Sequence, residues 1–178
     1  MAGRERGEAA RVRGAREGSV EDIEVLFRRH WPRAYRAAYL VVHDAAAAED
    51  IAQEAFLAAV RALDRFDGRR PFAPWLHRIV VNRAIDWARA RALRRELGDE
   101  PLTHAAARPR TGGVSEEVVA ALAGLSPDHR AVVVLRYLLE YTPGEIGAIL
   151  ELPRGTVNSR LRRALDALGA RLGGEASR

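Results

Sequence analysis

The chain has 178 residues, of which 29 are basic and 24 acidic, so its formal net charge at neutral pH is +5. This excess of positive charge favours a polyanionic partner such as nucleic acid. Because there is no cysteine, disulfides and cysteine-based zinc sites are excluded, and the five histidines do not stand at metal-ligand spacings. No apolar run is long enough for a membrane span or a signal peptide. We therefore expect a cytoplasmic protein with no metal, no other cofactor and no membrane insertion.

The N-terminal half begins with a segment that has almost nothing to bury. Residues 1–18 are rich in Gly, Ala, Arg and Glu, which predicts a flexible, arginine-rich tail. A helical pattern then runs from Ser19, where S-V-E-D has the form of a capping box, to residue 97. Asp44 is expected to cap a helix within this pattern. The glycine and prolines of residues 64–74 predict a loop before the last helix.

The C-terminal half is expected to form a separate helical unit. Residues 98–114 contain two prolines, three glycines and no periodic apolar face, which predicts a flexible linker. A second unit follows over residues 115–172, with a short tail over 173–178. Its helix starts are marked by Ser126-Pro127 and by Thr142-Pro143-Gly144-Glu145, a capping box with a first-turn proline. The fold prediction is all-α: two small helical domains, 19–97 and 115–172, joined by the linker.

Residues 142–168 have the spacing of a helix-turn-helix, because the short turn E-L-P separates two helical patterns. The second helix is predicted to bury one apolar stripe, composed of Val157, Leu161, Ala164, Leu165 and Leu168. Its Gly155 leaves room for a phosphate to approach first-turn N–H groups. Residues 154–171 contain five arginines against one aspartate. This charge favours DNA binding over the alternative, a helical hairpin with a solvated arginine face.

Two helices of the first domain have opposite charge. Residues 44–54 hold four acids and no base, and the helical pattern brings acidic side chains and an exposed leucine onto one face, which suits protein docking better than DNA. An ordinary solvated face is the alternative. The helix from Trp75 instead carries six arginines against one aspartate and follows a loop with two phenylalanines. Aromatic rings among arginines suit unpaired bases, which stack on the rings while phosphates meet the charge. Trp87 is assigned to the core, whereas Trp75 suits either role.

No catalytic set is present in either domain. Asp50 and Glu54 have no histidine at a useful spacing, and there is no Walker-type loop or G-x-S-x-G motif. We therefore do not expect an enzyme or a small-molecule substrate.

Three segments taken together resemble one known family. AEDIAQEAFLAAVRAL, PFAPWLHRIVVNRAIDWAR and LPRGTVNSRLRRAL, in this order, resemble the bacterial sigma-70 family, and more narrowly its extracytoplasmic-function (group IV) sigma factors. The resemblance covers about residues 21–95 and 116–172 and implies sigma region 2 in the first domain and region 4 in the second. It implies a transcription initiation factor that binds core RNA polymerase, reads the −10 and −35 promoter elements and stabilises melted DNA.

The resemblance also implies a role for each surface. The acidic helix would dock on the β′ coiled coil of core polymerase through Asp50, Gln53, Glu54, Leu57 and Arg61. The −10 element would be contacted by Phe66, Arg69, Trp75, Arg78, Ile79, Asn82, Arg83 and Arg89, with Ile79 and Asn82 facing a flipped base. The −35 element would be contacted by Arg154, Thr156, Asn158, Ser159, Arg160, Arg162 and Arg163. Further expected partners are the polymerase β flap and a cognate anti-sigma protein.

The sequence departs from the family pattern in the helix-turn-helix. Gly147 stands where alanine is usual, and Glu151 stands where the turn usually has glycine. Each departure is expected to cost up to about 1 kcal/mol, through helix propensity and left-handed backbone strain. Asn158 replaces a usual basic residue, which affects any inherited −35 preference.

The main rival function is a stand-alone helix-turn-helix regulator, which would bind duplex DNA tightly without polymerase. A sigma factor should bind it weakly alone, because the linker leaves the spacing of its two readers unfixed.

Overall fold

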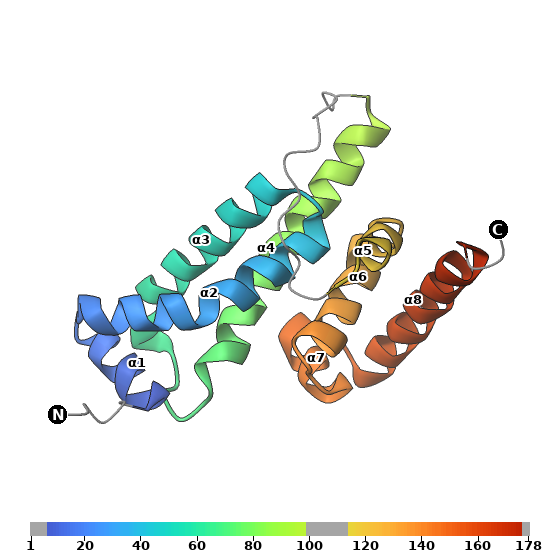
Figure 1. Ribbon diagram of the computed structural model, residues 1–178. Coiled ribbons are helices and arrows are strands. Elements are labelled where there is room, and N and C mark those ends of the chain that lie inside the picture. Colours follow the sequence, from blue (N-terminus) through green and yellow to red (C-terminus); the bar gives the residue numbers. More distant parts are fainter. Residues whose placement is uncertain (1–6, 99–113, 176–178) are drawn as a thin grey trace.

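The computed structural model describes residues 7–98 and 114–175, and within these ranges the regular structure is entirely helical. This confirms the all-α prediction. The first bundle contains α1 (Glu8–Arg16), α2 (Val20–Val42), α3 (Ala45–Arg61) and α4 (Phe72–Glu96). The second contains α5 (Glu116–Ala123), α6 (Pro127–Val133), α7 (Pro143–Leu150) and α8 (Arg154–Glu175). The two bundles lie next to each other, with the long α4 of the first facing the second (Figure 1).

The predicted linker and the predicted C-terminal tail lie largely outside the described residues. Apart from residues 98 and 114, the predicted linker lies outside the described residues, as do residues 176–178 of the predicted C-terminal tail. Residues 173–175 belong to the end of α8 instead. No helix in the described part of the chain has the length and apolar character needed to cross a membrane.

Side-chain caps define the helix starts, as their sequence signals predicted. Ser19 Oγ accepts a hydrogen bond from the Asp22 N–H at 3.2 Å, and Asp44 Oδ1 accepts one from the Ala47 N–H at 3.0 Å. The capping box of α7 is complete, because Glu145 Oε2 also accepts a hydrogen bond from the Thr142 N–H at 2.8 Å. These bonds satisfy N–H groups that have no partner within their own helix.

The predicted N-terminal tail is wrong for residues 8–16, which form α1. Val12 and Ala15 are buried, and Arg11 Nη1 lies 2.8 Å from Asp22 Oδ1 on α2. Gly14 allows the close approach of the two helices, because a Cβ at this position would lie 1.9 Å from Asp22 Oδ2. The sequence signal was weak because two small apolar residues make too short a stripe to predict a helix without the surface that covers them.

The two bundles contact each other through buried groups as well as through exposed ones. His77 on α4 is 2 % exposed, and its Nδ1 lies 2.7 Å from the Tyr141 hydroxyl, just before α7. The contact of His77 with the second bundle therefore sets how α4 and the helix-turn-helix face one another.

Within the second bundle, α6 continues into a π-helical turn, η2 (Val134–Leu138), and the core includes Leu135, Ile146 and Val157.

Candidate nucleic-acid interface

The helix-turn-helix is formed by α7, a three-residue turn and α8. Glu151 ends α7 in the left-handed conformation (φ 56°), and the Leu152 N–H then donates to the Gly147 carbonyl at 2.9 Å. The Pro153 carbonyl accepts from the Thr156 N–H at 2.9 Å, which begins α8. Glu151, which stands where the family's turn usually has glycine, therefore has the left-handed backbone that the sequence predicts at this position.

The apolar stripe of α8 packs inward and leaves the arginine face outward. Val157, Leu161, Ala164 and Leu168 are buried, but Leu165 is 41 % exposed, so its predicted burial is wrong. At 100° per residue, Leu165 lies farthest from the centre of the stripe. The exposed predicted −35 residues are Arg154, Asn158, Arg162 and Arg163.

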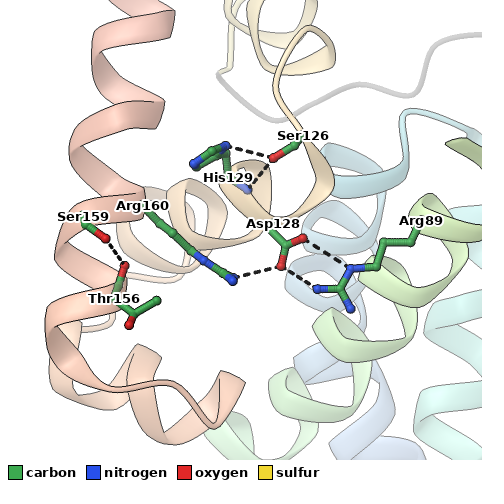
Figure 2. Close-up of polar contacts among 7 residues, drawn as sticks. All are labelled: Arg89, Ser126, Asp128, His129, Thr156, Ser159 and Arg160. Atoms are coloured by element: carbon green, nitrogen blue, oxygen red, sulfur yellow. Dashed lines mark hydrogen bonds and ion pairs between the residues drawn. The ribbon is translucent and has the colours of Figure 1, made fainter.

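Three other predicted −35 residues are half-buried: Thr156, Ser159 and Arg160. Ser159 Oγ donates to the Thr156 carbonyl at 3.0 Å, so its hydrogen is already used within α8 (Figure 2). Arg160 points toward α6, where its Nη1 lies 2.8 Å from Asp128 Oδ1 (Figure 2). The outward arginines of α8 are therefore available for a partner, whereas Arg160 already has one within the chain.

Asp128 also pairs with an arginine from the first bundle. Arg89 on α4 donates to its two carboxylate oxygens at 2.7 and 3.3 Å, so one acid joins a predicted −10 residue to the predicted −35 residue Arg160 (Figure 2). Arg78 on α4 forms a second ion pair across the boundary, with Glu151 in the helix-turn-helix. The sequence does not predict the pairings of Asp128 and Glu151 with α4, because no local pattern indicates a pairing between distant segments.

Replacing Asp128 with asparagine is expected to increase the affinity of the free chain for duplex DNA by about fivefold, measured by fluorescence anisotropy at constant salt. The change releases Arg89 and Arg160, and surface ion pairs contribute at most about 1 kcal/mol each. Asp166→Asn is the matched control, because Asp166 is exposed on α8 and its replacement changes the net charge equally. Equal gains in the two variants would show that only net charge matters.

The predicted −10 residues divide into a buried and an accessible group. Phe66 is only 6 % exposed, and its ring centroid lies 4.7 Å from that of Trp75 and 5.9 Å from that of Phe72. This corrects the prediction that Phe66 contacts DNA, because its ring fills an aromatic cluster inside the bundle. Trp75 is half-buried on top of this cluster.

The accessible −10 residues follow one side of α4 and the loop before it. Trp75, Ile79 and Asn82 are half-buried and recur at spacings of four and three, so they share a face. Arg78 and Arg83 are exposed beside them. In the loop, exposed Arg69 donates through Nε to Asp67 Oδ1 at 2.9 Å, and this hydrogen bond lowers the pKa of Asp67 to about 2.

The predicted docking residues are all exposed on α3: Asp50, Gln53, Glu54, Leu57 and Arg61. Leu57 is a large apolar side chain that is 55 % exposed among these polar groups. Glu54 Oε2 lies 2.8 Å from Arg83 Nη1 on α4, which connects the docking helix to the helix that carries the predicted −10 residues.

Trp87 on α4, which the sequence assigned to the core, is half-buried, and the Arg91 guanidinium lies 5.1 Å from its ring centroid.

Comparisons with known proteins agree with this arrangement. The family model of sigma-70 region 2 matches residues 26–94, and that of sigma-70 region 4 matches residues 121–169. The ECF RNA polymerase sigma factor SigW of Bacillus subtilis is 33% identical over 177 residues, which cover 91% of this chain and 95% of SigW.

Two solved structures share the fold. CnrH, solved in complex with the cytosolic domain of CnrY, has a TM-score of 0.71 and 30% identity, with coverage of 94% of this chain and 97% of CnrH. The sigma factor RpoE, solved with the anti-sigma factor NepR from Bartonella quintana, has a TM-score of 0.71 and 24% identity, with coverage of 86% and 98%. The chain therefore belongs to the sigma-70 family, among its extracytoplasmic-function sigma factors, and serves as a transcription initiation factor that directs RNA polymerase to promoters.

Proposed function

We propose that this sigma factor divides its work among three helices: α3 docks on core polymerase, α4 reads and opens the −10 element, and α8 reads the −35 element. The observation that carries this division is the sorting of exposed charge. The exposed face of α3 has acids around Leu57, whereas the outward faces of α4 and α8 carry arginines. Acidic and apolar groups suit a protein partner, and arginines suit DNA.

The docking face is proposed to bind the β′ coiled coil through Asp50, Gln53, Glu54, Leu57 and Arg61. Exposed Leu57 supplies apolar contact area at the centre, and the surrounding charges supply specificity and association rate. The second bundle is proposed to contact the polymerase β flap.

The −10 reader is proposed to hold a base flipped from the non-template strand against Trp75, Ile79 and Asn82. Trp75 offers a ring for stacking and Asn82 offers an amide for hydrogen bonds. Phe66 supports Trp75 from within the bundle. The remaining predicted −10 residues, Arg69, Arg78, Arg83 and Arg89, are proposed to contact phosphates.

The −35 reader is proposed to place α8 in the major groove. Arg162 and Arg163 suit bidentate contacts with guanine, and Asn158 suits adenine. Arg154 and the open first turn at Gly155 suit phosphates, since an added Cβ there would meet no atom within 4 Å. Thr156, Ser159 and Arg160 line the edge of this face, and Arg160 becomes available when it leaves Asp128.

The remaining parts of the proposal concern partners and chemistry. RpoE, which shares this fold, was solved with an anti-sigma factor, and we propose that a protein partner of that kind holds this chain inactive. Initiation of this kind needs binding energy and no covalent step by the factor, so we propose that the chain is not an enzyme. Because its targets are polymerase and chromosomal DNA, we infer that it acts in the bacterial cytoplasm.

The deciding experiment is transcription in vitro. Purified chain is added to sigma-free bacterial core polymerase on fragmented genomic DNA, and RNA 5′ ends are mapped. Discrete starts that share two upstream elements, and that need both components, are expected. If no discrete starts appear while the chain alone retains specific duplexes, the stand-alone regulator replaces this proposal.

Reversing the charge of the docking face is expected to weaken binding to core polymerase by at least tenfold. The double variant Asp50→Arg, Glu54→Arg places two positive charges where acids are proposed to meet the coiled coil. Glu17→Arg, Glu117→Arg is the control, since both glutamates are exposed elsewhere and the change in net charge is the same. Equal polymerase binding by the docking and control variants would contradict the assignment of α3.

A further inference from the structure

We propose that α1 is a clasp for the −10 loop, defined as residues 66–71, and that Arg16 and Glu8 are positioning residues for −10 recognition. This inference rests on the proposed role of α4 and its preceding loop. It adds residues that lie outside both matched family regions, which begin at residues 26 and 121.

The first contact fixes the start of the −10 loop. Arg16 donates through Nε and Nη2 to the Leu63 carbonyl at 3.0 and 2.9 Å, and through Nη2 to the Phe66 carbonyl. Leu63 begins a short 3₁₀ turn, η1 (Leu63–Arg65), that leads out of α3. The rigid, planar guanidinium can bind both carbonyls at once, so it fixes the direction in which the chain enters the loop.

The second contact fixes the end of the loop. Pro71, which precedes α4, makes no side-chain cap bond, but the Phe72 N–H donates to Glu8 Oε1 at 3.4 Å. A carboxylate at this position also interacts favourably with the positive end of the α4 dipole. Glu8 Oε2 lies 3.1 Å from His30 Nε2 on α2, which holds the carboxylate in place. The N-terminus of α4 is therefore capped by a different helix.

The clasp is itself anchored to α2. Arg11 pairs with Asp22, which is 1 % exposed, and Val12 and Ala15 are buried. A nine-residue helix is marginal in water by itself, so α1 depends on these contacts. Both ends of the −10 loop are thus connected through α1 to the body of the bundle, and Figure 1 shows α1 beside the chain that enters α4.

The consequence concerns accuracy in −10 recognition. The loop places Phe66 beneath Trp75, and Arg69 is exposed on it. If the loop moves, the Phe66 ring that supports Trp75 and the phosphate-binding charge of Arg69 move with it, whereas α3 and α8 do not. A loosened clasp should therefore reduce promoter opening and −10 discrimination while polymerase docking and −35 reading remain.

The test uses holoenzyme made with the full-length variants Arg16→Ala, Arg16→Lys and Glu8→Ala, on a promoter found by start-site mapping. Arg13→Ala is the matched control, because Arg13 is an exposed arginine on the same helix. Opening is measured by permanganate reactivity, and discrimination by the ratio of opening on the intact promoter to that on single-base −10 and −35 variants. Polymerase affinity and thermal unfolding are measured in parallel.

Arg16→Ala is expected to reduce opening five- to tenfold and to lower −10 discrimination at least threefold, with −35 discrimination and polymerase affinity within twofold of wild type. Arg16→Lys should restore part of the loss, Glu8→Ala should act in the same direction as Arg16→Ala, and Arg13→Ala should behave as wild type. The proposal is overturned if Arg16→Ala keeps wild-type opening and discrimination, or if all its activities decline in step with thermal stability. If wild-type holoenzyme opens no promoter, the proposed function fails first and this inference with it.

Discussion

Lowering the pH from 7 to 5 is expected to destabilise the folded chain by about 4 kcal/mol, beginning with the contact between its two bundles. Two histidines lie at this contact: buried His77 beside Tyr141, and half-buried His43 at the end of α2, near Arg130 on α6. The pKa of each histidine is lowered to about 4, mainly by burial. The charges of His30 and Arg33 also lower the pKa of His77, and the charge of Arg130 lowers the pKa of His43.

The direction of the effect follows from proton linkage. Unfolded histidine has a pKa of about 6.5, so between pH 6.5 and 4 the unfolded chain binds protons that the folded chain excludes. Stability is therefore complete above about pH 6.5 and falls as the pH decreases, by about 2 kcal/mol per histidine at pH 5. Neither histidine has a carboxylate among the groups that shift its pKa to offset this loss.

The measurement is urea unfolding at pH 7 and 5, followed by tryptophan fluorescence. The double variant His77→Gln, His43→Asn should lose most of the pH dependence: glutamine keeps a polar partner for Tyr141, and asparagine tolerates the left-handed backbone of residue 43. His129→Gln is the control, since His129 hydrogen-bonds to Ser126 within the second bundle (Figure 2). A double variant with the pH dependence of wild type would contradict the prediction.

The helices could be predicted because their signals are local. Ser19, Asp44 and Thr142 each cap the helix that follows them, and the bond involves residues three positions apart. α1 could not be predicted in this way, because the burial of Val12 and Ala15 depends on α2, and the tolerance for Gly14 depends on the position of Asp22. Such a helix is defined by the surface that it covers.

The candidate site shows the same limit. Periodicity identifies which residues share a face, and apart from Leu165 the exposed side chains of α3 and α8 named above follow that pattern. It does not show what lies against a face, so Phe66 was assigned to DNA although Trp75 and Phe72 enclose it. The meeting of Arg89 and Arg160 on Asp128 depends on how two bundles pack, which no pattern within either bundle encodes.

Replacing Gly147 with alanine is expected to destabilise the helix-turn-helix by about 1–3 kcal/mol, although alanine is usual at this position in the family and favours a helix by about 1 kcal/mol. In this chain an added Cβ would lie 2.7 Å from the Leu152 carbonyl oxygen. That oxygen belongs to the backbone of the turn, and it cannot rotate away as a flexible side chain would. The Leu152 N–H is also bonded to the Gly147 carbonyl, and Glu151 is already in the left-handed conformation.

Relief of this contact requires the turn to move, and α8 begins only two residues beyond Leu152. Gly147→Ala should therefore lower −35 discrimination in transcription as well as the free energy of unfolding in urea. Gly144→Ala is the matched control, because Gly144 lies in the same helix and an added Cβ would meet no atom within 4 Å. That variant should gain up to about 1 kcal/mol through helix propensity and the unfolded state. If Gly147→Ala gained as much as Gly144→Ala, the turn would have room for the family's alanine, and its tight geometry would not constrain the angle of the reading helix.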